Sequence, residues 1–481
     1  MGEGIAGGLG GEQRERRPGQ RGIGPWRSGV LRVPGLRLVT SAFVSAALSM
    51  TAYGQEPMTL GEAVAIALRS NPSIEAAEAG SLQAGAGIDQ ARSGYFPRVQ
   101  FAESLERSNN PVFAFGSLLN QRQFAESNFD VARLNNPEAI SNFQSRLSVE
   151  QTLFDSRRTQ HATRAARLRH DISQEQRRGS EADVILAVVQ TYFGVALAME
   201  NRRVAEESFR TTEADLQRAR DMFEAGMTTE ADVLSMRVHL AAVEEERIRA
   251  ENDVQIARAA LNDALGAPLD RTYELTTPLT PPPAPGEQAQ MYEQTAEAHP
   301  VLRQAEINLE LAQADLDLAK ASYWPEVVAV GVLESDRQRI ASRGGGNWLA
   351  GVSLRWNVWN GSETRARVAA ARYGKARADA LERQADSGVK LRVRQAFFAL
   401  QSAAKRLDVT EAAVAEAEES HRITQNRYQA GLTTATELIR SQTALMAAQG
   451  RRLAALYDQR VALASLEHAA GNLTAGSEAL Q

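Results

Sequence analysis

Cysteine is absent from this chain of 481 residues. The absence excludes a disulfide framework, a thiolate metal site, a cysteine nucleophile and a lipid anchor on cysteine. Aromatic residues amount to only 6% of the chain, and the net charge of -5 is small and spread along it. Such a charge gives no reason to expect nucleic acid as a partner. Long stretches dominated by Ala, Glu, Arg, Gln and Leu are instead typical of extended, surface-rich helices and coiled coils.

Signatures of catalysis are also missing from the sequence. It contains no GxSxG motif, no Walker loop and no HExxH motif, and its six histidines show no metal-ligand spacing. The abundant carboxylates lie on long polar helical patterns, where most of them form a solvated face. We therefore expect no enzyme, no cofactor and no metal site.

The N-terminal part of the chain, residues 1–54, is predicted to be separate from the fold. Residues 1–29 are rich in Gly and Arg and are expected to be disordered. Two arginines then precede an apolar run from Leu38 to Met50, followed by Ala52-Tyr53-Gly54. This is the pattern of a secretory signal peptide cut after Gly54. We expect no transmembrane helix in the mature chain, because no other segment has 18 uninterrupted apolar residues.

The remainder of the chain is built twice. The stretch FEAGMTT around Gly226 returns as YQAGLTT around Gly431, 205 residues later. Similar helical patterns, Pro-bounded interruptions and long polar segments precede both corners in the same order. We divide the chain into a first repeat at 55–275, a Pro-rich linker at 276–290, a second repeat at 291–472 and a short tail at 473–481.

Each interruption has the period of a β-hairpin, predicted at about 98–154 and about 326–359. In the second hairpin a row of apolar residues alternates with mostly polar ones, which is typical of a strand with one apolar face. The row consists of Trp348, Ala350, Val352, Leu354, Trp356 and Val358. Val328, Val330 and Val332 are expected to form its partner strand. The first loop is longer than the second.

The segments after the hairpins are predicted to be helical, at about 155–225 and about 360–430. They contain no proline and carry apolar residues at heptad-like spacing. About 70 residues make a helix roughly 100 Å long. Such a helix reaches a far tip, turns at Gly226 or Gly431, and returns as a second helix, at about 228–265 or about 433–470.

The predicted fold is mainly α with a small β part. Strands of about ten residues match those that cross a bilayer in a tilted barrel, and only a closed barrel satisfies all backbone polar groups in lipid. Four such strands leave open edges. We expect several copies to pool their strands in one membrane barrel above a hollow cylinder of helices, with a lipid-facing row. That row is Trp348, Val352, Leu354, Trp356 and Val358.

At this point the sequence resembles the TolC family of outer membrane efflux proteins, over about residues 57–472. The resemblance is carried by MTLGEAVAIALRSNPSI, SGYFP, SVEQTLFD and the two AG[ML]TT corners in this order. It implies a homotrimer in the outer membrane of a Gram-negative bacterium, with a twelve-strand barrel and a long periplasmic tunnel. It also implies docking to a periplasmic adaptor protein and an inner membrane pump of RND or ABC type, which supplies the energy for export.

The resemblance assigns roles to residues near the two corners. The family gate pairs an aspartate with a tyrosine, and the matching positions here are Asp232 and Tyr428. A carboxylate ring narrows the family's entrance, and Glu437 occupies that position. Arg440 departs from a second acidic ring of the founding members, so that Glu437 and Arg440 would pair with each other. Without the resemblance, Asp232 and Glu437 read as ordinary carboxylates at helix N-termini.

Two other classes of protein share parts of this pattern. An exported coiled-coil stalk without a pore explains the helices but leaves the two amphipathic hairpins without a role. A periplasmic adaptor has a helical hairpin, but only one, flanked by β domains. The substrate class remains open among drugs, metal ions and proteins.

Overall fold

The computed structural model describes residues 56–282, 292–294 and 296–480. The expected N-terminal extension and signal peptide, and the later part of the expected linker, lie outside these residues. All described residues belong to one compact unit that begins at Gln55. This unit is mostly helical with few strands, which confirms the predicted fold class.

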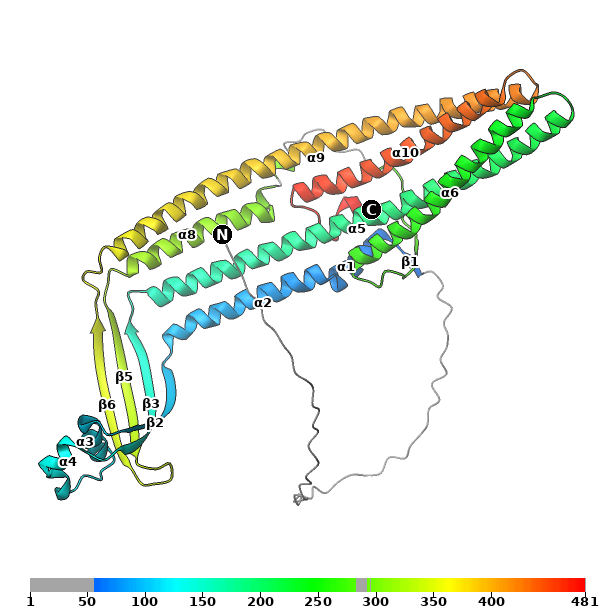
Figure 1. Ribbon diagram of the computed structural model, residues 1–481. Helices are drawn as coiled ribbons and strands as arrows, with labels where there is room; N and C mark the ends of the chain where they lie inside the picture. The colour runs from blue at the N-terminus through cyan, green and yellow to red at the C-terminus, as the bar shows by residue number, and fades with distance from the viewer. Residues whose placement is uncertain (1–55, 283–291, 295, 481) are drawn as a thin grey trace, which may run out of the picture. The chain divides into compact units, whose positions relative to one another are not determined.

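Two helices of 67 residues each dominate the unit, α5 (Arg158–Glu224) and α9 (Glu363–Gln429). Neither contains proline, so nothing interrupts their hydrogen-bond ladders. Apolar residues recur at helical spacing along them, and Val188, Tyr192 and Val195 of α5 are all buried. At 1.5 Å per residue each helix extends about 100 Å. Figure 1 shows them running from the sheet to the two Gly corners.

Shorter helices lie end to end along each long helix. The first repeat contributes α1 (Leu60–Ser70), α2 (Pro72–Arg92) and α6 (Glu230–Leu265), and the second contributes α8 (Pro300–Ala321) and α10 (Ala435–Ala469). Helices α2 and α6 pack on α5, whereas α8 and α10 pack on α9 (Figure 1). Each repeat is therefore a pair of antiparallel helical columns, one continuous and one divided.

The division in the first repeat is a tight junction between α1, α2 and the end of α6. Ser70 Oγ donates a hydrogen bond of 2.8 Å to the carbonyl oxygen of Leu265, and Asn71 Nδ2 donates one of 2.8 Å to that of Ala264. Gly266 ends α6 with φ +68°, and a Cβ there would lie 2.3 Å from the Ser70 carbonyl oxygen. Only glycine tolerates both conditions.

The second repeat closes its junction in the same way. Gly471 follows α10 with φ +75°, and a Cβ on it would lie 2.8 Å from the Cα of His299. His299 caps α8, because its Nδ1 accepts a hydrogen bond of 3.1 Å from the backbone N–H of Val301. The two junctions are thus equivalent positions of the repeat.

A four-stranded antiparallel sheet lies at the end of the helices away from the corners (Figure 1). Its strands stand in the order β2, β3, β5, β6 and are Arg98–Ser108, Ile140–Phe154, Glu326–Arg337 and Gly345–Arg355. The two predicted hairpins therefore lie side by side, joined through β3 and β5. Between β2 and β3 the chain forms two further helices, α3 (Pro111–Asn120) and α4 (Val131–Asn135).

The largest apolar core lies where the divided helices meet the middle of α5 and α9. A two-stranded parallel sheet, β1 (Glu56–Met58) with β4 (Tyr273–Leu275), borders it. The buried hydroxyl of Tyr192 donates a hydrogen bond of 2.9 Å to the Met58 carbonyl and accepts one of 3.0 Å from the N–H of Thr277. This core ties the start of the first repeat to the chain that leaves it. The sequence analysis did not foresee β1 and β4.

Helix α5 is, by length and composition, apolar enough to cross a membrane, and it is the one helix of the described residues that meets this criterion. Its most apolar residues are those from Val184 to Val195, and several of them lie in the core described above.

Candidate functional sites in the sheet and at the helical tip

One face of the four-stranded sheet is apolar. The register pairs Trp348 with Leu333, Val352 with Ala329, and Leu354 with Val327, so these side chains share a face. On the same face the first hairpin contributes Val99, Phe101, Leu147 and Val149. Trp348 is 78% exposed and Val352 is 69% exposed in the single chain. This apolar surface has no partner among the described residues, and it ends toward the outer rim, where Glu103 and Arg337 form an ion pair of 3.0 Å on the same face.

The opposite face is mostly polar and carries paired charges. Arg146 lies 3.5 Å from Glu334, and Arg355 Nη2 donates a hydrogen bond of 3.3 Å to Glu150. Ser353 also points to this side. The sheet thus separates one apolar face from one face suited to water.

The register corrects the prediction for the partner strand. Strand β5 is that partner, but Val328, Val330 and Val332 stand opposite Ser353, Gly351 and Leu349, on the polar face. Val328 is fully buried there. The residues that join the apolar row are their neighbours, because a shift of one residue moves a side chain to the other face.

The apolar row also ends earlier than predicted. Strand β6 stops at Arg355, so Trp356 and Val358 lie in the connection to α9. Trp356 Nε1 donates a hydrogen bond of 3.1 Å to the carbonyl oxygen of Tyr323, just before β5. Both side chains are exposed, as the predicted lipid contact would require.

Exposed aromatic residues gather where the helices meet the sheet, and sequence analysis missed them as a group. They are Tyr95, Phe96, Phe154, Tyr323, Trp324, Trp356 and Trp359. The signal was present in the repeated Tyr-Phe-Pro and Tyr-Trp-Pro tripeptides. Aromatic residues at one level below an apolar band are typical of a membrane–water interface.

The other end of the helical columns is the tip, where both corners lie close together (Figure 1). Gly226 has φ +72° and Gly431 has φ +69°. Past each glycine a backbone N–H reaches back five residues, from Met227 to the Met222 carbonyl and from Leu432 to the Arg427 carbonyl, both at 2.8 Å. These bonds satisfy carbonyl groups at the end of each long helix.

Side chains from all four long helical segments meet just inside the corners. The apolar cluster there comprises Leu216, Ala219, Val233, Met236, Tyr428, Ala435 and Leu438. The two hairpins of one chain therefore pack directly against each other at the tip.

Asp232 lies just past the first corner and near the start of the returning helix of the second hairpin. Its carboxylate accepts hydrogen bonds from the hydroxyls of Thr228, at 2.8 Å, and Thr229, at 2.9 Å. Burial raises its pKa, but the hydrogen bonds from Thr228 and Thr229 outweigh burial, with a smaller contribution from the nearby backbone N–H of Ala435, and hold the pKa below the ordinary value. Ala435 begins α10, so the carboxylate lies at the positive end of a helix.

Tyr428 lies close to Asp232 without a hydrogen bond to it. Its ring is buried, and its hydroxyl has no hydrogen-bond partner among the described residues. Burial raises the pKa of Tyr428, and the nearby charges of Asp232 and Asp215 add to that effect. The structure thus places the two predicted gate residues together, while the carboxylate is bonded elsewhere.

Glu437 and Arg440 form the ion pair that the sequence analysis gave as an alternative. Arg440 Nη1 donates a hydrogen bond of 2.9 Å to Glu437 Oε1. Both side chains are exposed, so the pair contributes little to stability. Glu437 does not contact Asp232 or Tyr428 through any hydrogen bond of the structure.

A layer of buried polar groups lies about three to four helical turns behind the tip, and sequence analysis missed it. Gln442 Nε2 donates a hydrogen bond of 2.7 Å to Thr212 Oγ1, and His421 Nδ1 lies 3.0 Å from Ser441 Oγ. Asp215 is almost fully buried and pairs with Arg218. Polar residues on a long charged helix carry no signal of burial, so this layer is visible only in the structure.

The described residues contain no group of three or more His, Cys, Asp and Glu side chains able to hold a metal ion.

Comparison with known proteins gives a consistent result. A model of the outer membrane efflux protein family matches residues 63–267 and 291–472. Protein CyaE of Bordetella pertussis is 25% identical over 87% of this chain and 85% of its own length. The alkaline protease secretion protein AprF of Pseudomonas aeruginosa is 23% identical over 69% of this chain and 70% of its own. Among solved structures, CusC matches with a TM-score of 0.72 at 18% identity, covering 86% of this chain and 92% of that one. The structural likeness establishes the fold.

Proposed function

Because the chain belongs to the outer membrane efflux protein family, we propose that three copies form one channel through the outer membrane and periplasm. Three four-stranded sheets close a twelve-stranded barrel in the membrane. The helical columns of the three chains form a tunnel below it. Substrates enter at the tip and leave through the barrel.

The observation that carries this proposal is the two-faced sheet with two open edges. Strands β2 and β6 each pair with one strand only among the described residues. An exposed edge in lipid leaves backbone polar groups unsatisfied, at a cost of several kcal/mol each. Pairing β2 of one copy with β6 of the next removes every edge, turns the apolar face to lipid and encloses the polar face around water.

The dimensions of the sheet agree with a bilayer. Trp348 and Trp356 stand near its two ends on the apolar side, eight residues apart. At about 3.3 Å per residue this separation spans roughly 26 Å along the strand, which at the usual tilt of barrel strands is about 20 Å across the membrane, most of the apolar band of outer membrane barrels.

The energy for export comes from partners, in this proposal a periplasmic adaptor and an inner membrane pump of RND or ABC type. The names of two relatives support a role in protein secretion and a role in efflux, since one is a protease secretion protein and the other an outer membrane efflux protein. The chain would thus be the outer component of a tripartite efflux or type I secretion system.

Fractionation and reconstitution test the proposal. The protein should require detergent for release from outer membranes, run as a trimer in light scattering, and form discrete conducting units in planar bilayers. A stalk or an adaptor would wash off without detergent and would not conduct. A stable folded monomer in detergent would contradict the closed barrel.

We further propose that Asp232 and Tyr428 hold the tip closed. Asp232 supports this role because its carboxylate is held at the first corner by Thr228 and Thr229 and lies near the backbone N–H of Ala435, at the N-terminus of α10 in the other hairpin. A hydrogen bond to a charged group is worth about 1.5–3 kcal/mol. Three copies would then bias the closed state by several kcal/mol, which is enough for a strong population shift. Glu437 and Arg440 would line the entrance nearby as a paired charge.

Single-channel conductance tests whether Asp232 and Tyr428 act as a latch that holds the tip closed. Asp232→Ala together with Tyr428→Phe should raise conductance, and Asp232→Ala alone should account for most of the rise, because the Tyr428 hydroxyl makes no hydrogen bond. Glu230→Ala is the matched control, since Glu230 is exposed in the same helical turn. If the double variant conducts like the unmodified protein while trimers stay intact, these residues are not the latch.

A further inference from the structure

The two hairpins differ at their outer ends. The second hairpin joins β5 to β6 through residues 338–344, whereas the first carries residues 109–139 between β2 and β3, with α3 and α4. The repeat therefore does not account for this insert. The contacts of this insert with the sheet indicate its role.

Helix α3 lies across the outer rim of the whole sheet. It begins at Pro111, directly after β2, and its other end contacts β6 at the far edge. There Arg122 Nη2 donates a hydrogen bond of 3.1 Å to the Gly346 carbonyl. A Cβ on Gly345 would lie 1.8 Å from the Asn120 carbonyl oxygen, so the helix end rests on glycine backbone. Ten residues span about 15 Å, and the gaps between four strands add up to about 14 Å.

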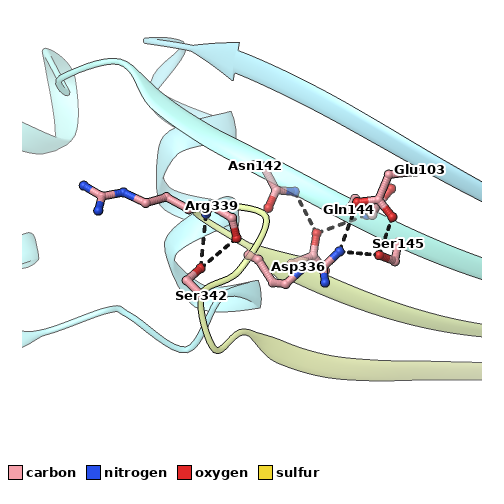
Figure 2. A network of polar contacts seen from close by, with 8 residues as sticks. Glu103, Asn142, Gln144, Ser145, Asp336, Arg339 and Ser342 are labelled. Carbon is pink, nitrogen blue, oxygen red and sulfur yellow. Dashed lines mark hydrogen bonds and ion pairs between the residues drawn. The ribbon is translucent and has the colours of Figure 1, made fainter. Parts of the chain in front are cut away.

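The same end of α3 also rests on the polar face of the sheet. Gln121 Nε2 donates a hydrogen bond of 2.9 Å to Asn142 Oδ1, and Asn142 Nδ2 donates one of 2.7 Å to Asp336. Gln144 also donates to Asp336, at 3.2 Å. Figure 2 shows Asn142 and Gln144 on β3 directed at Asp336 of the neighbouring strand. Asp336 is fully buried, and its pairing with Gly345 places it on the side that the barrel encloses.

The side of α3 away from the sheet is apolar and uncovered. Ala114 and Ser117 are buried toward the sheet, while Val112 is 82% exposed and Leu119 is 48% exposed. Residues 112 and 119 are seven apart, so they lie on one helical face, opposite the buried pair. Phe115 packs against Phe124 with ring centroids 4.9 Å apart, which fixes the rest of the insert to the helix.

We propose that the three α3 helices of the channel form an apolar collar inside its outer mouth. The proposal rests on the proposed function, because it requires the closed trimer. Pairing β2 of one copy with β6 of the next brings the start of one α3 beside the end of the neighbouring α3. The partner of each helix end is therefore a second copy of this chain, in a head-to-tail contact that a three-fold ring closes. Val112 and Leu119 point away from the wall, into the path of the substrate.

An apolar ring of this kind opposes the passage of water and ions by dewetting. It would let substrates with apolar surface pass more readily than small charged solutes arriving from outside. The outer mouth would thus carry a barrier separate from the tip.

The absence of cysteine makes crosslinking a clean test of the head-to-tail contact. The variant Val112→Cys with Leu119→Cys, treated with a short bismaleimide in intact cells, should give covalent dimers and trimers. Each single variant should remain monomeric on a denaturing gel, because its cysteines sit at the same end of separate helices. Native trimers are scored first by light scattering without crosslinker. Absent trimers would overturn the proposed function, whereas intact trimers without covalent products would overturn the collar alone.

A labelling experiment tests the barrier itself. Ser148 lies on the polar face of β3, and Ser148→Cys gives one thiol inside the barrel. A charged, impermeant maleimide added to cells should label it slowly, and faster once Leu119→Asp wets the collar. Val131→Ser is the control, since Val131 is exposed on α4 and is not part of the apolar face of α3. Equal labelling rates in all three backgrounds, with trimers intact, would overturn the collar.

Discussion

A single arginine at neighbouring positions of β6 tests which face of the sheet meets lipid. Val352 lies on the apolar face, midway in sequence between Trp348 and Trp356. Ser353, the next residue, lies on the opposite face. The substitutions Val352→Arg and Ser353→Arg thus add the same group to the same strand, one at the middle of the apolar band and one in the enclosed space.

The expected difference follows from the depth of the site. Arginine at the bilayer midplane costs about 2–4 kcal/mol, whereas a substitution in the lumen of a barrel costs much less. Three copies share one barrel, so Val352→Arg should destabilise the assembled trimer by roughly 6–12 kcal/mol. Such a loss exceeds the stability that many domains have in reserve.

Refolding into lipid vesicles measures the effect. The trimer yield and the urea midpoint should fall sharply for Val352→Arg and stay near the unmodified values for Ser353→Arg. If both variants assemble equally well and unfold at the same urea concentration, the apolar face does not meet lipid, and the register argument for the barrel fails.

Two further variants probe the helical part. Gly266→Ala should lower the thermal midpoint of unfolding more than Gly226→Ala. Both glycines have positive φ, which costs an alanine about 1–2 kcal/mol. A Cβ at Gly226 meets no atom within 4 Å, whereas one at Gly266 would lie 2.3 Å from the Ser70 carbonyl oxygen. Equal thermal midpoints for the two variants would show that the junction accommodates the added Cβ without losing stability. Burial lowers the pKa of His421 and of His239, which lies on α6 near Gln442, below 6.5. The unfolded chain therefore binds more protons than the folded chain, and the stability of the tip falls as pH drops below about 6.5. Hydrogen exchange at the tip should therefore accelerate from pH 7.5 to 5.5, and replacing both histidines with Gln should flatten that dependence; an unchanged slope would exclude them.

The repeated corners and long helices were predictable because their signals are local and duplicated. Gly226 and Gly431 occur in the same short motif, and proline is absent from the segments that became α5 and α9. The alternation from Trp348 to Leu354 likewise identified a strand and its apolar face.

Other features depend on partners that are distant in sequence. The run around Val328 is apolar at both even and odd positions, so its period cannot assign a face, and the pairing with β6 decides it. The buried position of Asp215 depends on two hairpins meeting at the tip. Helix α3 was expected only as part of a longer loop. Its position depends on contacts with the rim of the sheet, and two of the strands that it contacts, β5 and β6, are distant in sequence.

The junctions at Gly266 and Gly471 give the molecule two pivots. Between each junction and the tip, one column is a continuous helix, α5 or α9. The other column is a separate helix, α6 or α10, that ends next to the junction glycine. Helix α6 has 36 residues and so reaches about 54 Å from its pivot to the tip. A tilt of about 10° would carry its far end through about 9 Å, by the lever geometry of hinge motion. The barrel could therefore stay fixed in the membrane while a small rotation at two positions far from the entrance sets the width of the entrance.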